Sequence, residues 1–283
     1  MVLQLLLGFN LAIIISVLAY ALSALSLYGA VAASILGFVV FGLGGLDWAI
    51  LLLAFFISSS VLSKVAKKRK EQLEEKFSKG SRRDAAQVLA NGGVAGVFVL
   101  LHVLFPDLFW PWIGFAASLA AANADTWATE LGVLNPSLPR LITTGKPVER
   151  GVSGGVSLGG LAAAVAGALL VGLLAAIFFP GSALVPVSGS ANQIPPFLMT
   201  LERTVLLGLA GFTGSLVDSV LGATVQAIYT CPACRKITER HPFHSCGTPT
   251  TLLRGLPWLN NDWVNFACTF SSAVIALAFY FII

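Results

Sequence analysis

The hydrophobic positions of this chain form long uninterrupted runs that are separated by short polar breaks. A helix needs about 20 apolar residues to cross the hydrocarbon core of a bilayer. The pattern therefore predicts an all-α fold, a polytopic transmembrane helix bundle of about seven to eight spans that forms one domain over the whole chain. The expected spans are 2–21, 24–45, 47–63, 87–105, 111–130, 153–179, 200–228 and 262–283.

Composition supports an integral membrane protein and argues against nucleic acid as a partner. The chain is 57% hydrophobic and 11% charged, whereas soluble domains carry about 25% charged residues. The net charge of +4 comes from cations that gather in a few loops, so it does not indicate a nucleic-acid surface. No basic residues precede the first run, 2–21, and we expect it to stay as a helix rather than be cleaved as a signal peptide.

The distribution of positive charge predicts the orientation of the spans. Nine of the 17 Lys and Arg residues lie between Lys64 and Arg83. Because basic loops stay in the cytoplasm, we expect a cytosolic basic loop at 64–86. Alternating the spans from there also places loops 131–152 and 229–261 inside and both termini outside. The site chemistry is therefore expected on the cytoplasmic face.

Two predicted spans carry an acid several residues inside their ends, Asp125 and Asp218. A carboxylate at mid-bilayer costs at least about 2.5 kcal/mol and usually faces the bundle interior. A metal or substrate site is our preferred interpretation, and a structural acid paired with Lys or Arg is the alternative. Both segments begin G-F-x-x-S-L, and helical spacing places each acid on a face of small or polar residues: Ser118, Ala122 and Thr129 for the first, and Gly211, Ser215, Gly222 and Gln226 for the second.

A cationic turn rich in Gly and Ser joins these two regions of the chain. Lys146 and Arg150 precede the glycines and serines of 151–160, where the sixth span is expected to begin. Backbone N–H groups at such a turn and the helix dipole favour phosphate. Close packing of small residues is the alternative explanation, and the P-loop pattern is absent.

The loop at 229–261 predicts a zinc knuckle formed by Cys231, Cys234, His244 and Cys246. A CxxC pair followed by a His and a Cys suits a tetrahedral, structural Zn²⁺ site, with His244 preferred to His241 as the fourth ligand. A redox CxxC pair and unliganded cysteines are the alternatives. The polar cluster at 258–265 fits a helix cap at Asn261 or Asp262 and a contact with the site equally well.

Several strings resemble one polytopic membrane family, which includes plant phytyl-phosphate kinase. More distantly, the acid-bearing helix and the Lys- and Gly-rich turn are similar to the CTP-dependent dolichol and phytol kinases. The resemblance is expected from about residue 80 to the end of the chain. The strings that carry it are 87–93, ADTWATELG at 124–132, PRLITT at 139–144, 151–155 and 222–226.

The resemblance implies transfer of a phosphoryl group from a nucleotide, CTP, to an isoprenyl monophosphate. Asp125 and Asp218 would hold Mg²⁺. The main alternative function is a transporter or carrier of a lipid phosphate that catalyses no reaction. The third possible function is a membrane scaffold stabilised by zinc. The sequence leaves the oligomeric state open. The candidate catalytic residues are Asp125, Asp218, Glu130 and Lys146, and the candidate substrate- or nucleotide-binding residues are Asn123, Arg140, Thr144, Arg150, Gly151, Ser153, Gly154 and Gly155.

Overall fold

The computed structural model describes residues 2–70, with side chains to residue 66, together with 82–180 and 195–282. These residues form eight long helices, the second of which continues into a π-helical turn, η1 (Val39–Gly44). The helices are α1 (Val2–Ala21), α2 (Leu27–Phe38), α3 (Leu46–Lys70), α4 (Ala85–Leu104), α5 (Trp110–Gly132), α6 (Leu158–Ile177), α7 (Pro196–Thr224) and α8 (Asn261–Ile282).

The helices confirm the predicted polytopic membrane bundle. Within the described ranges, seven helices are long and apolar enough to cross a membrane. The eighth, α5, carries polar and charged residues in its second half, and it is enclosed by its neighbours α3, α4, α6, α7 and α8. A helix in the middle of a bundle does not face lipid, so it can keep polar residues that an outer helix could not.

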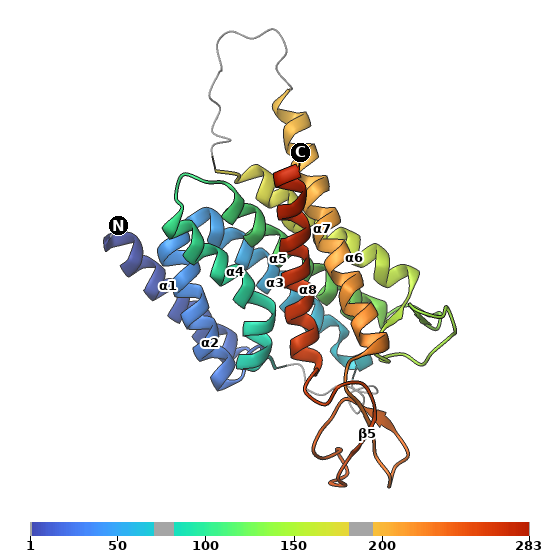
Figure 1. The fold of residues 1–283 in the computed structure, drawn as a ribbon. Helices are drawn as coiled ribbons and strands as arrows, with labels where there is room; N and C mark the ends of the chain where they lie inside the picture. Colours follow the sequence, from blue (N-terminus) through green and yellow to red (C-terminus); the bar gives the residue numbers. More distant parts are fainter. Residues whose placement is uncertain (1, 71–81, 181–194, 283) are drawn as a thin grey trace.

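Successive helices run in alternating directions, so that both termini lie at one end of the bundle (Figure 1). The segments after α5 and after α7 lie at the opposite end, together with the start of α4 (Figure 1). This arrangement agrees with the predicted grouping of the loops. Part of the predicted basic loop, residues 71–81, lies outside the described residues.

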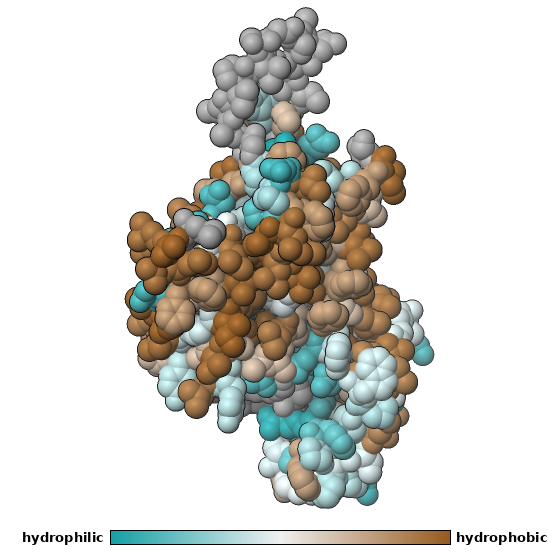
Figure 2. Space-filling model, turned by 60° about the vertical axis from the view of Figure 1, so that its left-hand side comes forward, coloured by the Kyte–Doolittle hydropathy of each residue, from teal (hydrophilic) through white to brown (hydrophobic). Residues whose placement is uncertain are grey.

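On the face that Figure 2 shows, hydrophobic side chains form a broad belt across the helical body, and hydrophilic residues gather on the lobe below it. The belt contains outward-facing aliphatic and aromatic residues from the outer helices, such as Ile35, Leu209 and Phe270. Apolar side chains exposed in this way are those of a surface that faces lipid. The chain is therefore an integral membrane protein with a polar lobe at one end.

Two short β elements interrupt the loops at that end. β1 (Arg140–Leu141) and β2 (Gly155–Val156) pair antiparallel. In the second element, β3 (Ile228–Thr230) lies between β4 (Ile237–Thr238) and β5 (Thr251–Arg254) in an antiparallel sheet. This sheet forms the core of the lobe that precedes α8.

The start of the sixth span differs from the prediction. α6 begins at Leu158 rather than at residue 153, after Ser157, whose hydroxyl accepts a hydrogen bond from the Gly160 N–H at 3.1 Å. Residues 153–157 cannot continue the helix backward, because Gly154 has a φ of +82°. The glycine-rich segment is thus a separate turn, held by β2, and not the first turn of the helix.

Small residues bring α5 and α7 into close contact, and of the residues in this contact Gly211 belongs to a face predicted from the sequence. A Cβ atom added to Gly211 would lie 2.7 Å from the Ala120 Cβ, and one added to Gly214 would lie 2.9 Å from the Ala121 Cβ. Larger side chains would therefore push the two helices apart. This contact fixes the spacing of the helices that carry Asp125 and Asp218.

Candidate functional site

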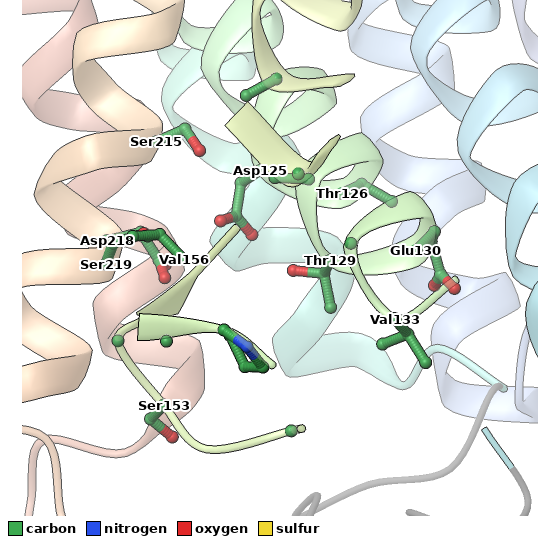
Figure 3. Close-up of a pocket in the computed structure, with 18 of the residues that line it drawn as sticks. Asp125, Thr126, Thr129, Glu130, Val133, Ser153, Val156, Ser215, Asp218 and Ser219 are labelled. Atoms are coloured by element: carbon green, nitrogen blue, oxygen red, sulfur yellow. The ribbon is translucent and has the colours of Figure 1, made fainter. Parts of the chain in front are cut away.

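A polar cavity of about 300 Å³ lies at the loop end of the bundle, between α5, α7 and the glycine-rich turn. Asp125 enters it from α5, and Asp218 enters it from α7 (Figure 3). Ser215 and Ser219, close to Asp218 along α7, and Thr129 on α5 also line it. The two acids that the sequence predicts as a pair are thus brought into one cavity, although 93 positions separate them along the chain.

The two carboxylates suit a divalent cation. The charge of Asp218 interacts with those of Asp125 and Glu239, so three acids act on one another here. The Asp218 Oδ2 atom is buried without a hydrogen-bond partner among the described residues. Because like charges destabilise one another in a low-dielectric site, a divalent cation bound between the two aspartates would stabilise them. Carboxylate oxygens are the ligands that Mg²⁺ prefers.

The glycine-rich turn closes the cavity and docks on the end of α7. A Cβ atom added to Gly154 would lie 2.5 Å from the Ala223 Cβ, and one added to Gly222 would lie 3.0 Å from the Gly154 N atom. Gly151, Ser153 and Gly155 also line the cavity. The glycines are therefore needed for a close backbone approach, and the same approach places their backbone beside the acids.

We expect Gly154→Ala to destabilise the protein more than Gly145→Ala. Both glycines have positive φ, +82° and +67°, so alanine is strained at each by about 1–2 kcal/mol. Only at Gly154 would the new methyl group also collide, with Ala223, since nothing lies within 4 Å at Gly145. Thermal unfolding of the two variants in detergent measures the difference. Equal melting temperatures would contradict the docking of the turn on α7.

Arg150 is the predicted cation that reaches the cavity. It lines the cavity, and its Nη2 atom donates a hydrogen bond to the Pro136 carbonyl at 2.6 Å. Arg140, Thr144 and Lys146 are exposed on the β1–β2 hairpin. None of them is among the described residues that line the cavity. The Arg140 Nη1 atom donates to the Gly145 carbonyl at 2.9 Å. Lys146 is exposed near the tip of this hairpin, and the structure does not bring it to the acids.

Asn123 and Glu130 lie on α5 but in different surroundings. Asn123 is buried and is not among the described lining residues: its Oδ1 accepts from Ser58 at 2.9 Å, and its Nδ2 donates to the Gly167 carbonyl at 2.8 Å. It therefore links α5 to α3 and α6. Glu130 lines the cavity, accepts a hydrogen bond from Ser63 at 2.7 Å and points away from the pair of aspartates (Figure 3).

Sequence reasoning missed Glu239, the acid that the polar lobe contributes to the cavity. Its Oε1 atom accepts hydrogen bonds from Ser153 at 2.5 Å and from Gln226 at 2.9 Å. Arg254 anchors the same lobe by donating to the carbonyls of Gly222 and Ala223 at the end of α7. In the sequence, the one signal for Glu239 is its position two residues before His241. The metal-ligand pattern of Cys and His residues does not include it.

The polar cluster before α8 serves both functions that the sequence left open. The Asn260 side chain caps the helix, since its Oδ1 atom accepts from the N–H groups of Asp262 at 3.0 Å and Trp263 at 3.2 Å. Asn261 and Asn265 line the polar cavity. The cap is therefore one residue earlier than predicted, and the cluster also contributes amides to the site.

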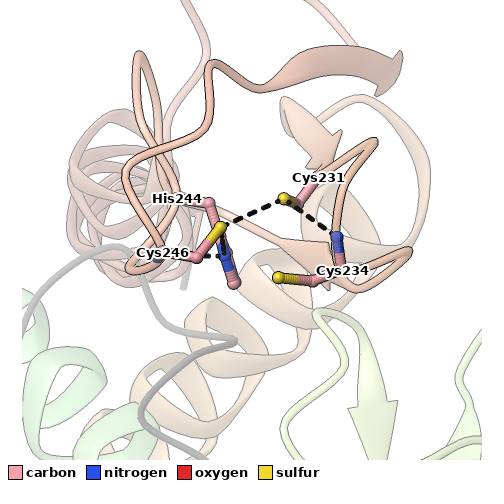
Figure 4. Close-up of side chains that lie close together, drawn as sticks. All are labelled: Cys231, Cys234, His244 and Cys246. Atoms are coloured by element: carbon pink, nitrogen blue, oxygen red, sulfur yellow. Dashed lines mark hydrogen bonds between the residues drawn. The ribbon is translucent and has the colours of Figure 1, made fainter.

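The cysteine lobe forms a compact group of metal-ligating atoms (Figure 4). The ligand atoms of Cys231, Cys234, His244 and Cys246 all lie within 4.8 Å of one another. Two sulfurs on a tetrahedral zinc with bonds of about 2.3 Å lie about 3.8 Å apart, and the Cys231 and Cys246 sulfurs are 3.6 Å apart. His241 instead stacks on Tyr229, with ring centroids 4.4 Å apart. The group could therefore bind a metal ion, with His244 as its fourth ligand.

Hydrogen bonds already favour a thiolate in this group. They lower the pKa of Cys246 to about 5, with the Thr248 hydroxyl as the main cause and His244 next. In contrast, the hydrogen bond with Cys246 is the main cause that raises the pKa of Cys234 to about 11. Cysteine binds a metal ion as the thiolate, so the lowered pKa of Cys246 favours metal binding.

The family described as integral membrane protein DUF92 matches residues 10–273 of this chain. The chain belongs to this family. The match begins 70 residues earlier than the position near residue 80 expected from the sequence, so α1, α2 and α3 are part of the DUF92 fold. The strings that carry the resemblance contain polar residues, whereas the first helices are apolar and contain no such string.

The DUF92 relatives include plant and archaeal proteins. "Protein PGR" of Arabidopsis thaliana is 35% identical over 87% of this chain and 86% of its own length. "Uncharacterized membrane protein MJ0933" of Methanocaldococcus jannaschii is 34% identical over 70% of this chain and 73% of its own. "Protein VTE6, chloroplastic" of Arabidopsis thaliana is 26% identical over 89% of this chain and 64% of its own. No solved structure matches the chain.

Proposed function

We propose that this protein is an isoprenyl-phosphate kinase, which transfers the terminal phosphoryl group of a nucleotide to an isoprenyl monophosphate. CTP is the donor and phytyl or another prenyl phosphate the acceptor that the family resemblance suggests. The observation that carries the proposal is the pair Asp125 and Asp218, which enter one polar cavity from two helices at one end of the bundle.

The residues of the cavity suit phosphoryl transfer, a reaction that needs positioning and charge neutralisation more than covalent chemistry. In this proposal Asp125 and Asp218 would hold Mg²⁺, which would supply positive charge to offset the repulsion of the two phosphate-bearing substrates. Arg150 and the backbone N–H groups of 151–155 orient the donor phosphates. An oxygen of the lipid monophosphate forms the new bond to the donor's terminal phosphorus as the bond to the leaving nucleoside diphosphate breaks. A phosphate dianion needs no base to lose a proton.

Zn²⁺ is the ion that we propose for the cysteine group. Three sulfurs and one imidazole nitrogen leave no open position on a tetrahedral ion, so its function is structural. The lobe that it would hold carries Glu239, which contacts Ser153 of the glycine-rich turn. We infer that the metal stabilises the position of the glycine-rich turn beside the acids.

The position of the cavity favours a kinase over a transporter. A transporter needs polar groups near the bilayer midplane that open to each side in turn. Here the described lining residues gather at the end of the bundle that carries the loops. A substrate with a lipid tail and a phosphate head suits such a boundary.

Purified protein incubated with Mg²⁺, one of CTP, ATP, GTP or UTP, and a panel of prenyl monophosphates tests the proposal. We expect a prenyl diphosphate and the matching nucleoside diphosphate in equal amounts, with CTP as the preferred donor. Chromatography of both products measures this. No diphosphate with any donor, together with uptake of prenyl phosphate into proteoliposomes, would establish the transporter instead.

We also expect the cysteine lobe and the segment 64–86 to face the cytoplasm. The expected cause is their excess of Lys and Arg. A single-cysteine reporter at Ser78 and another at Ser245, in a background without other cysteines, can be labelled in intact cells with a membrane-impermeant maleimide. Both should resist labelling until the membrane is opened, whereas a reporter at Ser188 should react at once. Labelling of only one of the first two from outside would contradict this topology.

A further inference from the structure

A second pocket, which is apolar, lies between the first four helices. We call it the apolar groove. Among the described residues, Arg83 is the one charged residue that lines the groove, and few of the other lining residues are polar. Apolar and small residues of the first four helices line it, among them Ala33, Phe55, Phe56 and Val88.

The apolar groove adjoins the polar cavity. Arg83, Gln87 and Asn91 line both of them. These three residues lie at and just inside the start of α4, at the loop end of the bundle. The carboxylates of the cavity and the hydrocarbon walls of the groove therefore lie on the two sides of these three polar side chains.

Arg83 is held at this boundary by contacts on both sides. Its guanidinium carbon lies 5.8 Å from the Phe55 ring centroid and 5.9 Å from that of Phe56, on the groove side. Its Nη1 atom donates to Ser60 at 3.4 Å. Burial lowers the pKa of the Arg83 guanidinium, and the nearby charge of Glu130 opposes that effect. A partly buried cation at the junction of polar and apolar surfaces suits an anionic group that carries a hydrocarbon chain.

We infer that the apolar groove holds the proximal part of the isoprenyl chain and that Arg83 binds the phosphate to which this chain is attached. The inference rests on the proposed function and adds to it the site of the acceptor. The chain would enter between α1, α2, α3 and α4, and its phosphate would reach past Arg83 toward Asp125. The first three helices, which contribute none of the predicted chemistry, thereby have a function in substrate binding.

Two variants on one helix separate filling of the groove from a general effect of bulk. Ala33 lines the groove, and Ile35, two residues along α2, is 62% exposed on the outer belt. We expect Ala33→Trp to raise the KM for a C20 prenyl phosphate about tenfold, the effect of losing a few buried methylene groups. The KM for the nucleotide should not change, and the KM for a C5 prenyl phosphate should rise less than that for the C20 acceptor, because a shorter chain places fewer methylene groups in the groove. Ile35→Trp should leave all three constants unchanged.

Arg83→Gln provides the complementary result. Because Arg83 is assigned to the phosphate and not to the chain, the KM should rise for the C5 and C20 acceptors alike and stay constant for the nucleotide. An Ala33→Trp variant with an unchanged C20 KM, or an Arg83→Gln variant that affects only the nucleotide, would overturn the assignment.

Photo-crosslinking tests the groove without any activity. A prenyl monophosphate with a diazirine in its first isoprene unit is irradiated with the wild-type protein, and the labelled peptides are mapped by mass spectrometry. We expect labels on groove residues of α1 to α4, reduced by unlabelled prenyl phosphate and by Ala33→Trp. Labels confined to α6–α8, or equal labelling by a diazirine phosphatidylcholine, would overturn the inference. Groove labelling without diphosphate formation would keep the groove and refute the kinase.

Discussion

Replacing Asp125 or Asp218 with asparagine should lower the turnover of prenyl phosphate at least about a hundredfold, the usual effect of losing one preorganised electrostatic group. Asparagine is nearly isosteric with aspartate, so the close packing of α5 against α7 should persist. What disappears is the negative charge that would hold Mg²⁺ between the two phosphates. Initial rates at saturating substrate, with Mg²⁺ varied, measure the effect.

Asp107→Asn is the matched control for these variants. Asp107 is exposed in the connection between α4 and α5, at the end of the bundle opposite to the cavity. Its substitution removes the same charge from the chain and should leave turnover unchanged. Near-normal turnover in both Asp125→Asn and Asp218→Asn would refute the assignment of the site, whereas loss in all three variants would indicate an effect of net charge or of stability.

The second large effect is expected from Cys234→Ser. Protein purified without chelator should contain about one zinc per chain, and this variant should contain almost none, because a serine hydroxyl replaces a thiolate ligand. The melting temperature should fall, since the free energy of metal binding also contributes to folding of the lobe. Elemental analysis and thermal unfolding in detergent measure the two quantities.

Cys268→Ser distinguishes the metal site from cysteine chemistry in general. Cys268 is buried within α8, outside the group of four. Its replacement should preserve the zinc content, whatever it does to stability. Absence of zinc from folded, active wild-type protein would contradict the metal assignment. Turnover of Cys234→Ser should also fall, because the lobe carries Glu239 and contacts Ser153 of the glycine-rich turn.

The sequence by itself determined the features that depend on local spacing. Runs of apolar residues predicted the helical membrane bundle, because a bilayer requires a minimum length of apolar helix. The cost of a carboxylate among apolar residues singled out Asp125 and Asp218 as inward-facing. Spacing along the lobe predicted the group around Cys231, because its four ligands come from 16 consecutive residues.

Only the tertiary structure decided which distant residues meet. Arg150 and Lys146 are equally basic in sequence, but the β1–β2 hairpin turns one toward the cavity and leaves the other exposed at its tip. Glu239 reaches the acids because Arg254 fixes the lobe on α7. In the sequence, Arg83 does not differ from the other cations of the basic loop. Its position at the junction of the two pockets arises from the packing of α3 and α5 beside it. Such contacts arise from the folding of separate segments against one another, and no periodicity within one segment encodes them.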